Sequence, residues 1–230
     1  MIISHKHKFI FIKTAKTGGS SIEKILDPFL DPNDVASGGW YKDYDGSSDT
    51  LTRQLSWKPI GYPQDLGGDS HASAQYIYDI FFQGQKPKDY FVFTIERNSY
   101  DKAVSHWWWH TRTKPIYKGK PAVEISFEDH LQKFVSGQKN NHPSCWHRYS
   151  ANDNICVDMV YRHDSMLDMF SDLSQRFKIE ISEDQVKNTR LKDSNKPFNN
   201  YREPYTDITK NLVKKIFAQE LKHFKYDFEL

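Results

Sequence analysis

The 230-residue chain is short of cysteine, of net charge and of long apolar runs, and each shortage excludes a class of protein. A single pair of cysteines, Cys145 and Cys156, in a chain without a secretory leader favours two thiols over a disulfide. Lys and Arg number 32 against 30 Asp and Glu, so the formal net charge of +2 gives no global basic field to hold nucleic acid. No apolar run approaches the roughly 20 residues that cross a bilayer. We therefore expect a cytoplasmic protein that engages neither a membrane nor nucleic acid.

Metal-binding patterns are missing as well. The chain has ten histidines, yet none of them belongs to an H-E-x-x-H motif, and the two cysteines form no C-x-x-C pair. A catalytic thiol needs a basic neighbour that lowers its pKa, and His147 near Cys145 is a weak hint of one. We expect neither a metal centre nor a cysteine nucleophile.

What the chain does contain is a glycine-bearing turn between a strand and a helix, in residues 8–24, KFIFIKTAKTGGSSIEK. The run from Phe9 to Ile12 is apolar and rich in β-formers, which predicts a buried strand. Gly18 and Gly19 follow it, and glycine lets a backbone approach a ligand without Cβ clashes. The segment therefore predicts a backbone cradle at the end of the first strand.

The residues around these glycines predict that the ligand is an anion. Ser20 or Ser21 is expected to cap the following helix, whose first N–H groups and positive dipole end face the turn. Lys13 and Lys16 add mobile positive charge at the same place. A phosphate or a sulfate fits such a cradle.

The order of the residues differs from that of the nucleotide-binding P-loop, G-x-x-x-x-G-K-[ST], because Lys16 precedes the glycines.

A second motif stands in residues 90–109, YFVFTIERNSYDKAVSHWWW, which again predict a buried strand and a helix. Arg97 ends this strand, and Ser105 follows eight positions later on the helix. A guanidinium gives bidentate contact to a phosphate, and a helix-borne hydroxyl adds a neutral hydrogen bond.

Together the two motifs resemble those of sulfotransferases that use 3′-phosphoadenosine 5′-phosphosulfate (PAPS), especially the carbohydrate-type, sulfotransferase family 2-like branch. That branch often carries P-K-T-G-G-[ST]-S, where this chain has Ala15 in place of the proline. It also carries R-[DN]-P-[YW]-[DE]-[RK]-x-x-S, where Ser99 replaces the proline. The remaining matched positions of this second pattern are Arg97, Asn98, Tyr100, Asp101, Lys102 and Ser105.

The resemblance implies a role for each residue. The loop would bind the 5′-phosphosulfate, with Lys16 at the leaving oxygen and Lys13 as a supporting charge. Arg97 and Ser105 would bind the 3′-phosphate, and His71, which introduces a helix between the two motifs, would be the general base. The other cofactor-binding positions are Thr17, Gly18, Gly19, Ser20 and Ser21. The departing product is adenosine 3′,5′-bisphosphate, and the scheme requires no metal.

Two later segments extend the resemblance. VDMVYRHDSMLDMF resembles the family's V-D-x-[IV]-x-R-x-E segment, with Asp158, Arg162 and Asp164 at the charged positions. We expect Arg162 to be a structural partner of one of these aspartates. Near the C-terminus, Tyr201 and Tyr205 fall in a stretch that resembles the family's Y-R-x-Y-Y cluster.

The roles assigned to the two lysines and to Arg97 have structural alternatives. Lys16 is alternatively an exposed loop lysine. The alternative for Lys13 is that it only flanks the strand and contacts no ligand. Arg97 is alternatively a buried ion-pair partner of Glu96 or Asp101.

Ser105 and His71 have alternatives too. Ser105 alternatively caps or packs, and His71 alternatively closes the start of its helix. His106, His110 and Asp69 are rival candidates for the base.

The predicted elements alternate between strand and helix, which argues for a parallel sheet covered on both faces. We expect strands at residues 8–13, 90–96 and 156–161, and helices at residues 20–30, 72–84, 98–110, 127–136, 164–177 and 205–223. The resemblance implies a P-loop-like three-layer α/β/α fold with a central, mainly parallel sheet. It also implies a single sulfotransferase domain, 1–230, with substrate-side loops at about 31–70 and 111–150.

The acceptor is expected to be a hydroxyl of a carbohydrate or related small molecule, because aromatic rings stack on sugars. The aromatic candidates are Trp40, Tyr41, Tyr44, Trp57, Trp107, Trp108 and Trp109, and the candidate cations are Lys114, Lys118 and Lys120. The three consecutive tryptophans must place at least one ring in the core, since neighbouring helical residues point about 100° apart.

Two other functions stay open. A P-loop-like kinase that uses ATP would need a lysine after the glycines and a magnesium-binding acid at a strand end. A glycan-binding protein on the same fold would have lost turnover. The sequence does not determine the oligomeric state.

Overall fold

The computed structural model describes residues 1–36, 71–117, 119–189 and 196–229. They belong to two compact units, Met1–Glu96 with His147–Leu191, and Arg97–Trp146 with Lys192–Leu230. The single domain expected from the sequence stays a prediction. Of the expected loop at 31–70, residues 37–70 lie outside the described residues and residues 31–36 include a short strand, whereas the expected loop at 111–150 contains helices.

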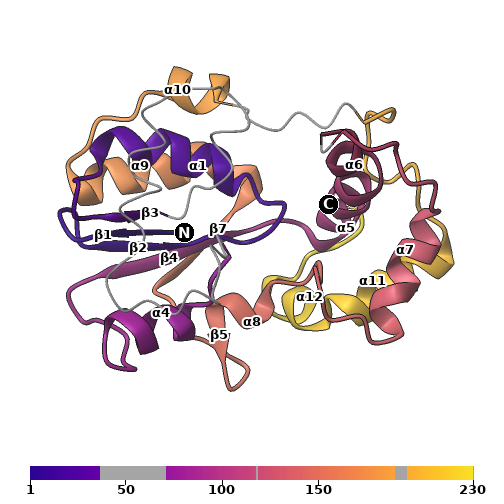
Figure 1. Cartoon of the computed structure of the whole chain (residues 1–230), viewed down its shortest axis with the longest axis horizontal. Helices are drawn as coiled ribbons and strands as arrows, with labels where there is room; N and C mark the ends of the chain where they lie inside the picture. The colour runs from indigo at the N-terminus through magenta and orange to yellow at the C-terminus, as the bar shows by residue number, and fades with distance from the viewer. Residues whose placement is uncertain (37–70, 118, 190–195, 230) are drawn as a thin grey trace. The chain divides into compact units, whose positions relative to one another are not determined.

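The first unit is built on a five-stranded sheet of order β3-β1-β2-β4-β7 (Figure 1). Its strands are β1 (Ile2–Ser4), β2 (Phe9–Ile12), β3 (Val35–Ala36), β4 (Phe91–Glu96) and β7 (Met159–Arg162). β2 pairs in parallel with β4, and β4 with β7, whereas β1 is antiparallel to both of its neighbours. Four strands therefore run in one direction, which confirms the expected mainly parallel sheet. The antiparallel β1 follows from its short connection to β2, since a parallel pair needs a longer crossover.

Helices cover both faces of this sheet (Figure 1). Helix α1 (Gly19–Leu26) and helix α9 (Met166–Phe177) lie on one face, and α4 (Ala74–Phe81) lies on the other. The unit also has two 3-10 turns, η1 (Asp27–Phe29) and η4 (His163–Ser165), the helix α10 (Glu183–Asn188), and a small hairpin of β5 (Ser150–Ala151) and β6 (Asn154–Ile155).

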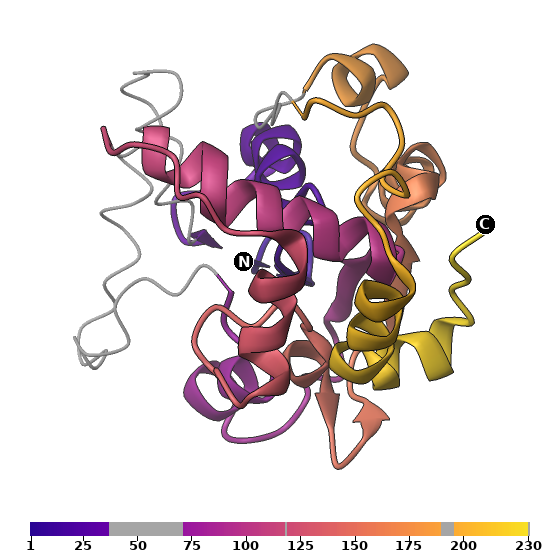
Figure 2. The ribbon, with the colours of Figure 1, turned by 90° about the vertical axis from the view of Figure 1, so that its right-hand side faces the viewer.

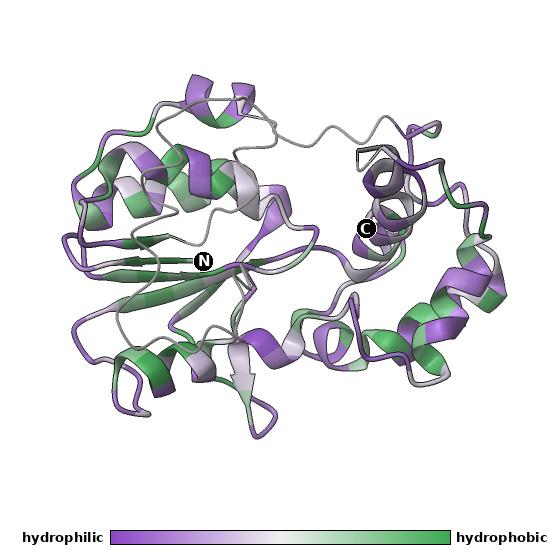
Figure 3. Cartoon of the chain, in the orientation of Figure 1, coloured by the Kyte–Doolittle hydropathy of each residue, from purple (hydrophilic) through white to green (hydrophobic). Residues whose placement is uncertain are grey.

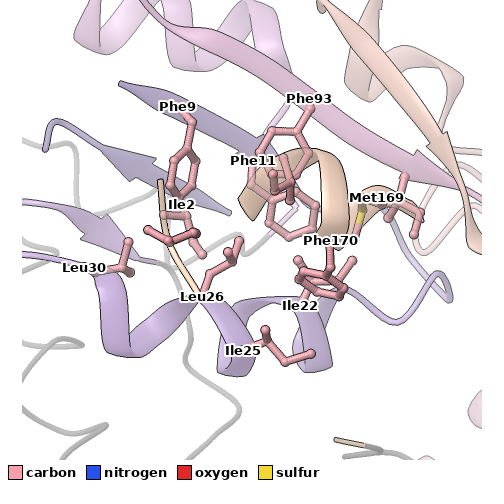
Figure 4. Packing of buried hydrophobic residues seen from close by; sticks show 13 residues of the cluster. Ile2, Phe9, Phe11, Ile22, Ile25, Leu26, Leu30, Phe93, Met169 and Phe170 are labelled. Carbon is pink, nitrogen blue, oxygen red and sulfur yellow. The ribbon is translucent and has the colours of Figure 1, made fainter. Parts of the chain in front are cut away.

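The core of the first unit lies between the sheet and helices α1 and α9 (Figures 3 and 4). All four residues of β2 are buried, as expected for a continuous apolar run in the middle of a sheet. The rings of Phe11 and Phe93 stack with centroids 5.3 Å apart, and Phe9 lies 5.9 Å from Phe93. Each such side chain contributes about 1.5–3 kcal/mol by its burial. This packing fixes the strand that leads into the glycine turn.

The second unit is helical. Its elements are α5 (Ser99–Trp108), the π-helix η3 (Trp109–Thr113), α6 (Lys114–Tyr117), α7 (Phe127–Val135), α11 (Asp207–Ile216) and α12 (Ala218–Phe224). The short helix α8 (Trp146–Tyr149) lies where the chain passes from this unit back to the first. Figure 2 shows α5, η3 and α6 as one continuous helix. Among the three tryptophans, Trp109 is the buried one, so the expected core ring is present.

The helical core joins α5, α7 and α11 and is formed by Tyr100, Ala103, Val104, Phe127, Leu131, Leu212, Val213 and Phe217. The expected helix 205–223 is in fact two helices, because the chain bends at Phe217. Ile208, in the first turn of α11, is 57% exposed. No helix in the described ranges is both long and apolar enough to cross a membrane.

Candidate functional site

The turn between β2 and α1 contains two residues in the left-handed region. Lys16 and Gly18 both have left-handed φ angles, 63° and 78°. Gly18 is the N-cap of α1, and its carbonyl accepts hydrogen bonds from the amides of Ser21 (2.9 Å) and Ile22 (3.1 Å). Left-handed residues beside right-handed ones point successive N–H groups into one concavity. The expected side-chain cap from Ser20 or Ser21 is therefore wrong: a glycine in a left-handed conformation begins this helix.

Gly19 is required for a different reason, namely space. A Cβ atom at Gly19 would lie 2.7 Å from Cγ of Lys13, which no side chain tolerates. At Gly18, by contrast, an added Cβ would make ordinary contacts of 3.7 Å with His163 and Met166. The first glycine therefore serves conformation, and the second lets α1 pack onto Lys13.

Threonine hydroxyls tie the turn to the neighbouring strand. Thr14 donates from Oγ1 to the carbonyl of Ile95 at 2.5 Å, and its Oγ1 lies 2.9 Å from Oγ1 of Thr17. The Thr17 hydroxyl is also 3.1 Å from the carbonyl of Thr14, and Thr17 is fully buried. This hydroxyl therefore takes part in the turn itself, and its contact with a phosphate stays a prediction.

Lys13 is not the mobile charge that the sequence suggests. It is buried, and its Nζ donates to Oε2 of Glu23 at 2.5 Å. Oε1 of the same carboxylate accepts from the amino group of Met1 at 2.6 Å. Burial alone would raise the pKa of Glu23, but the two cations outweigh it, and the pKa is lowered. The carboxylate thus stays charged in the core because two ammonium groups balance it.

His71 is held beside the end of β2. Its Nδ1 lies 3.0 Å from the carbonyl oxygen of Lys13. A carbonyl can only accept, so Nδ1 carries the hydrogen and, in the neutral ring, Nε2 carries the lone pair. The cap of α4 is Ser73, whose hydroxyl accepts from the amide of Tyr76 at 3.2 Å. His71 therefore does not close that helix.

Lys16 and the two serines complete the turn. Lys16 and Ser21 are half-buried, and Ser20 is buried. The first N–H groups of a helix have no acceptor within that helix, and α1 begins at Gly19. The turn thus brings together the Lys16 side chain, these backbone N–H groups and the α1 dipole.

Arg97 and Ser105 belong to the second unit. Both Nε and Nη2 of Arg97 donate to Oδ2 of Asp101, at 2.6 Å and 2.5 Å. Ser105 lies two turns along α5 and is 6% exposed. The structural alternative for Arg97, an ion pair with Asp101, is present, and the phosphate contact stays a prediction.

Among the rival bases, His106 and His110 have contacts with other histidines, and Arg162 has an acidic partner. His106 is buried, and its Nδ1 lies 3.0 Å from Nε2 of His130. The ring of His110 packs 4.3 Å from that of His106. Arg162 pairs with Asp164 at 2.8 Å, as expected for a structural role. Asp69, Lys118 and the aromatic residues of 37–70 lie outside the described residues.

Both cysteines lie in the part of the chain that the structure describes. Cys145 and Cys156 are thiols and form no disulfide. Burial raises the pKa of Cys156, which makes it a poorer nucleophile. No group of three or more His, Cys, Asp or Glu in these ranges is arranged to hold a metal ion.

Comparison with protein-family models, with curated proteins and with solved structures gives no match for this chain.

Sequence reasoning missed two residues that shape the turn. Thr14 immediately precedes it, and a hydroxyl at a strand end was the available signal. Glu23 stands among Ile22, Ile25 and Leu26 on the buried side of α1. A carboxylate at a core position needs a cation, and Lys13 was within reach to provide it.

Proposed function

We propose that this protein transfers a sulfuryl group from PAPS to a hydroxyl of a carbohydrate or a related small molecule. The observation that carries the proposal is the turn at Lys16–Gly19, where a lysine, a glycine-lined backbone and a helix N-terminus follow a buried parallel strand. Ligands in such sheets bind beyond the carboxyl ends of the strands. The three-layer P-loop-like arrangement of the family would place its cofactor at this turn.

The residues of the turn fit the 5′-phosphosulfate. Gly18 holds the left-handed conformation that begins α1, Gly19 lets this helix pack onto Lys13, and in this scheme the N-terminus of α1 faces the phosphate oxygens. Lys16 supplies the positive charge at the phosphosulfate in this scheme, whereas Lys13 is buried and paired with Glu23. Arg97 and Ser105 bind the 3′-phosphate in this scheme.

The chemistry follows from what sulfuryl transfer requires. As a bond forms between the acceptor oxygen and sulfur, the bond from sulfur to the 5′-phosphate oxygen breaks. Nε2 of His71 takes the acceptor proton, and the carbonyl of Lys13 holds the ring in the tautomer that can do so. Lys16 stabilises the negative charge that grows on the departing phosphate oxygen. Adenosine 3′,5′-bisphosphate and the sulfated acceptor leave.

The test is the transfer of radiolabelled sulfate from PAPS to a panel of glycans and small hydroxylated acceptors. We expect Lys16→Ala to lower turnover by roughly 10²–10³-fold, as for the loss of a charge stabiliser. His71→Ala is expected to lower it by about 10²–10⁴-fold, as for the loss of a general base. Arg97→Ala is expected mainly to weaken cofactor binding.

The matched control is Lys6→Ala, which removes a lysine of the same unit that pairs with Asp31 on the surface. Its turnover should equal that of the wild type. Unchanged turnover in His71→Ala would show that the base lies elsewhere. Transfer of phosphate from ATP, without transfer of sulfate, would replace the proposal with a kinase.

A further inference from the structure

A lysine that the sequence motifs do not include lies beside Arg97 in the second unit. Nζ of Lys196 is 3.8 Å from Oδ1 of Asp101, while Arg97 holds Oδ2 of the same carboxylate. The three side chains are 16–22% exposed. Two cations distant in sequence are thus gathered around one carboxylate.

The place of this cluster favours an anion. Asp101 is on the first turn of α5, a ten-residue helix whose N-cap is Asn98, and Arg97 directly precedes that cap. Asp101 offsets one of the two cations, and the positive end of the helix dipole adds to the net positive charge that is left. Because the cluster is largely shielded from water, its charges are screened less than those of an exposed surface pair.

The chemistry of the two cations is complementary. Arg97 presents a planar fork and engages one oxygen with two of its N–H groups, whereas an ammonium is a compact point charge that approaches from another direction. A phosphate dianion has three terminal oxygens, so it can satisfy both cations at once. Arg97 alone would leave the remaining oxygens to solvent or neutral donors.

We infer that Lys196 is a second cation of the 3′-phosphate site, with Asp101 holding the Arg97 and Lys196 side chains side by side. The inference rests on the proposed function and extends it. Lys196 then determines whether the protein distinguishes a nucleotide with a 3′-phosphate from one without it.

The experiment compares two nucleotides by calorimetry on the whole protein, adenosine 3′,5′-bisphosphate and adenosine 5′-phosphate. We expect Lys196→Gln to weaken bisphosphate binding by roughly 10- to 100-fold, the size of a charge-assisted hydrogen bond. Binding of adenosine 5′-phosphate should not change, since that nucleotide lacks the group that Lys196 contacts. Lys196→Arg, which keeps the charge, should restore most of the lost affinity.

The matched control is Lys187→Gln, which removes an ion-paired lysine of the first unit and should change neither affinity. Equal loss for both nucleotides in Lys196→Gln, or no loss for either, would overturn the role of Lys196. If the wild type prefers the bisphosphate and Lys196→Gln retains that preference, the inference fails while the proposed function stands. A wild-type protein that binds neither nucleotide overturns both.

Discussion

Glu23 shows how single residues set the geometry of the turn. Its carboxylate anchors Lys13 and the amino group of Met1 inside the first unit. The stem of Lys13 in turn packs under Gly19, and its carbonyl orients His71. Through Lys13, this one buried acid thus supports both the packing of Gly19 and the orientation of the candidate base, His71.

Removal of this charge should be strongly destabilising. Glu23→Gln would leave two ammonium groups buried without their counter-ion, so we expect a loss of about 3–5 kcal/mol in unfolding free energy. Urea denaturation at neutral pH measures it. Glu183→Gln, which breaks the exposed pair with Lys187, is the control and should give no measurable change. Equal curves for Glu23→Gln and wild type would show that the buried pair is not formed.

A second residue-scale prediction concerns Ser99, where the resembling family has proline. Its hydroxyl is buried and has no hydrogen-bond partner within the described ranges. Ser99→Ala should therefore be neutral or raise the unfolding free energy by up to about 1 kcal/mol. In contrast, Ser4→Ala removes a buried hydroxyl that donates to Asp34 at 2.8 Å, and should lower it by about 1–3 kcal/mol. Thermal unfolding of both variants measures these changes. A clear loss of stability in Ser99→Ala would show that the Ser99 hydroxyl has a hydrogen-bond partner after all.

At the scale of elements, continuous apolar runs were enough to predict the strands that carry the turn. The expected strands 8–13 and 90–96 match β2 and β4 to within one residue at every end. The short strands β1 and β3 were missed, because strands of two or three residues have no readable period. Helix α10 was missed although Ser182 and Gln185 form a capping box, which is a readable signal.

The cap of α1 was beyond sequence reasoning, since serines are common caps and a left-handed glycine is visible only in φ. The break at Phe217 has a similar cause. The apolar period runs unbroken from α11 into α12, so nothing in the pattern marks the bend.

The contact between α5 and α7 predicts a pH dependence of stability. His130 on α7 is buried against His106 on α5. Burial, and to a lesser extent the charge of Lys133, lowers the pKa of His130 to about 4 from 6.5. Between pH 6.5 and 4 the unfolded chain binds a proton that the folded imidazole excludes. Stability therefore falls as the pH falls through this window.

The quantity to measure is the slope of the unfolding free energy against pH. We expect this residue to lower the unfolding free energy of the wild type as the pH decreases from 6.5 to 5, with a slope that rises toward a limit of about 1.4 kcal/mol per pH unit. The pKa of His142 is also lowered by burial, so it adds to the slope. His130→Gln keeps a hydrogen-bonding group and does not titrate, and its slope should be smaller by that amount. An unaltered slope would mean that His130 is accessible to protons in the folded state.

At the scale of the whole molecule, the chain enters its second unit at Arg97 and returns to the first at His147. This division could not be predicted, because Glu96 and Arg97 are consecutive residues of one strand–helix motif with no linker between them. Composition instead bears on the partners of the whole protein, because the net charge predicts that it does not bind nucleic acid. Nearly balanced cations and anions give no field for nucleic acid.

A gel-shift experiment with duplex DNA at about 150 mM salt examines that expectation. With a net charge of +2, counterion release contributes little, and we expect no shifted band at micromolar protein. A salt-dependent shift would show that a local basic surface dominates over the net charge.

The central claim is that this protein binds a nucleotide with phosphates at both the 3′ and 5′ positions. Calorimetric titration of the whole protein with adenosine 3′,5′-bisphosphate, and separately with ATP, tests it most directly. The account predicts binding of the bisphosphate at roughly micromolar concentration or tighter, and much weaker binding of ATP. Tight binding of ATP with none of the bisphosphate would contradict it.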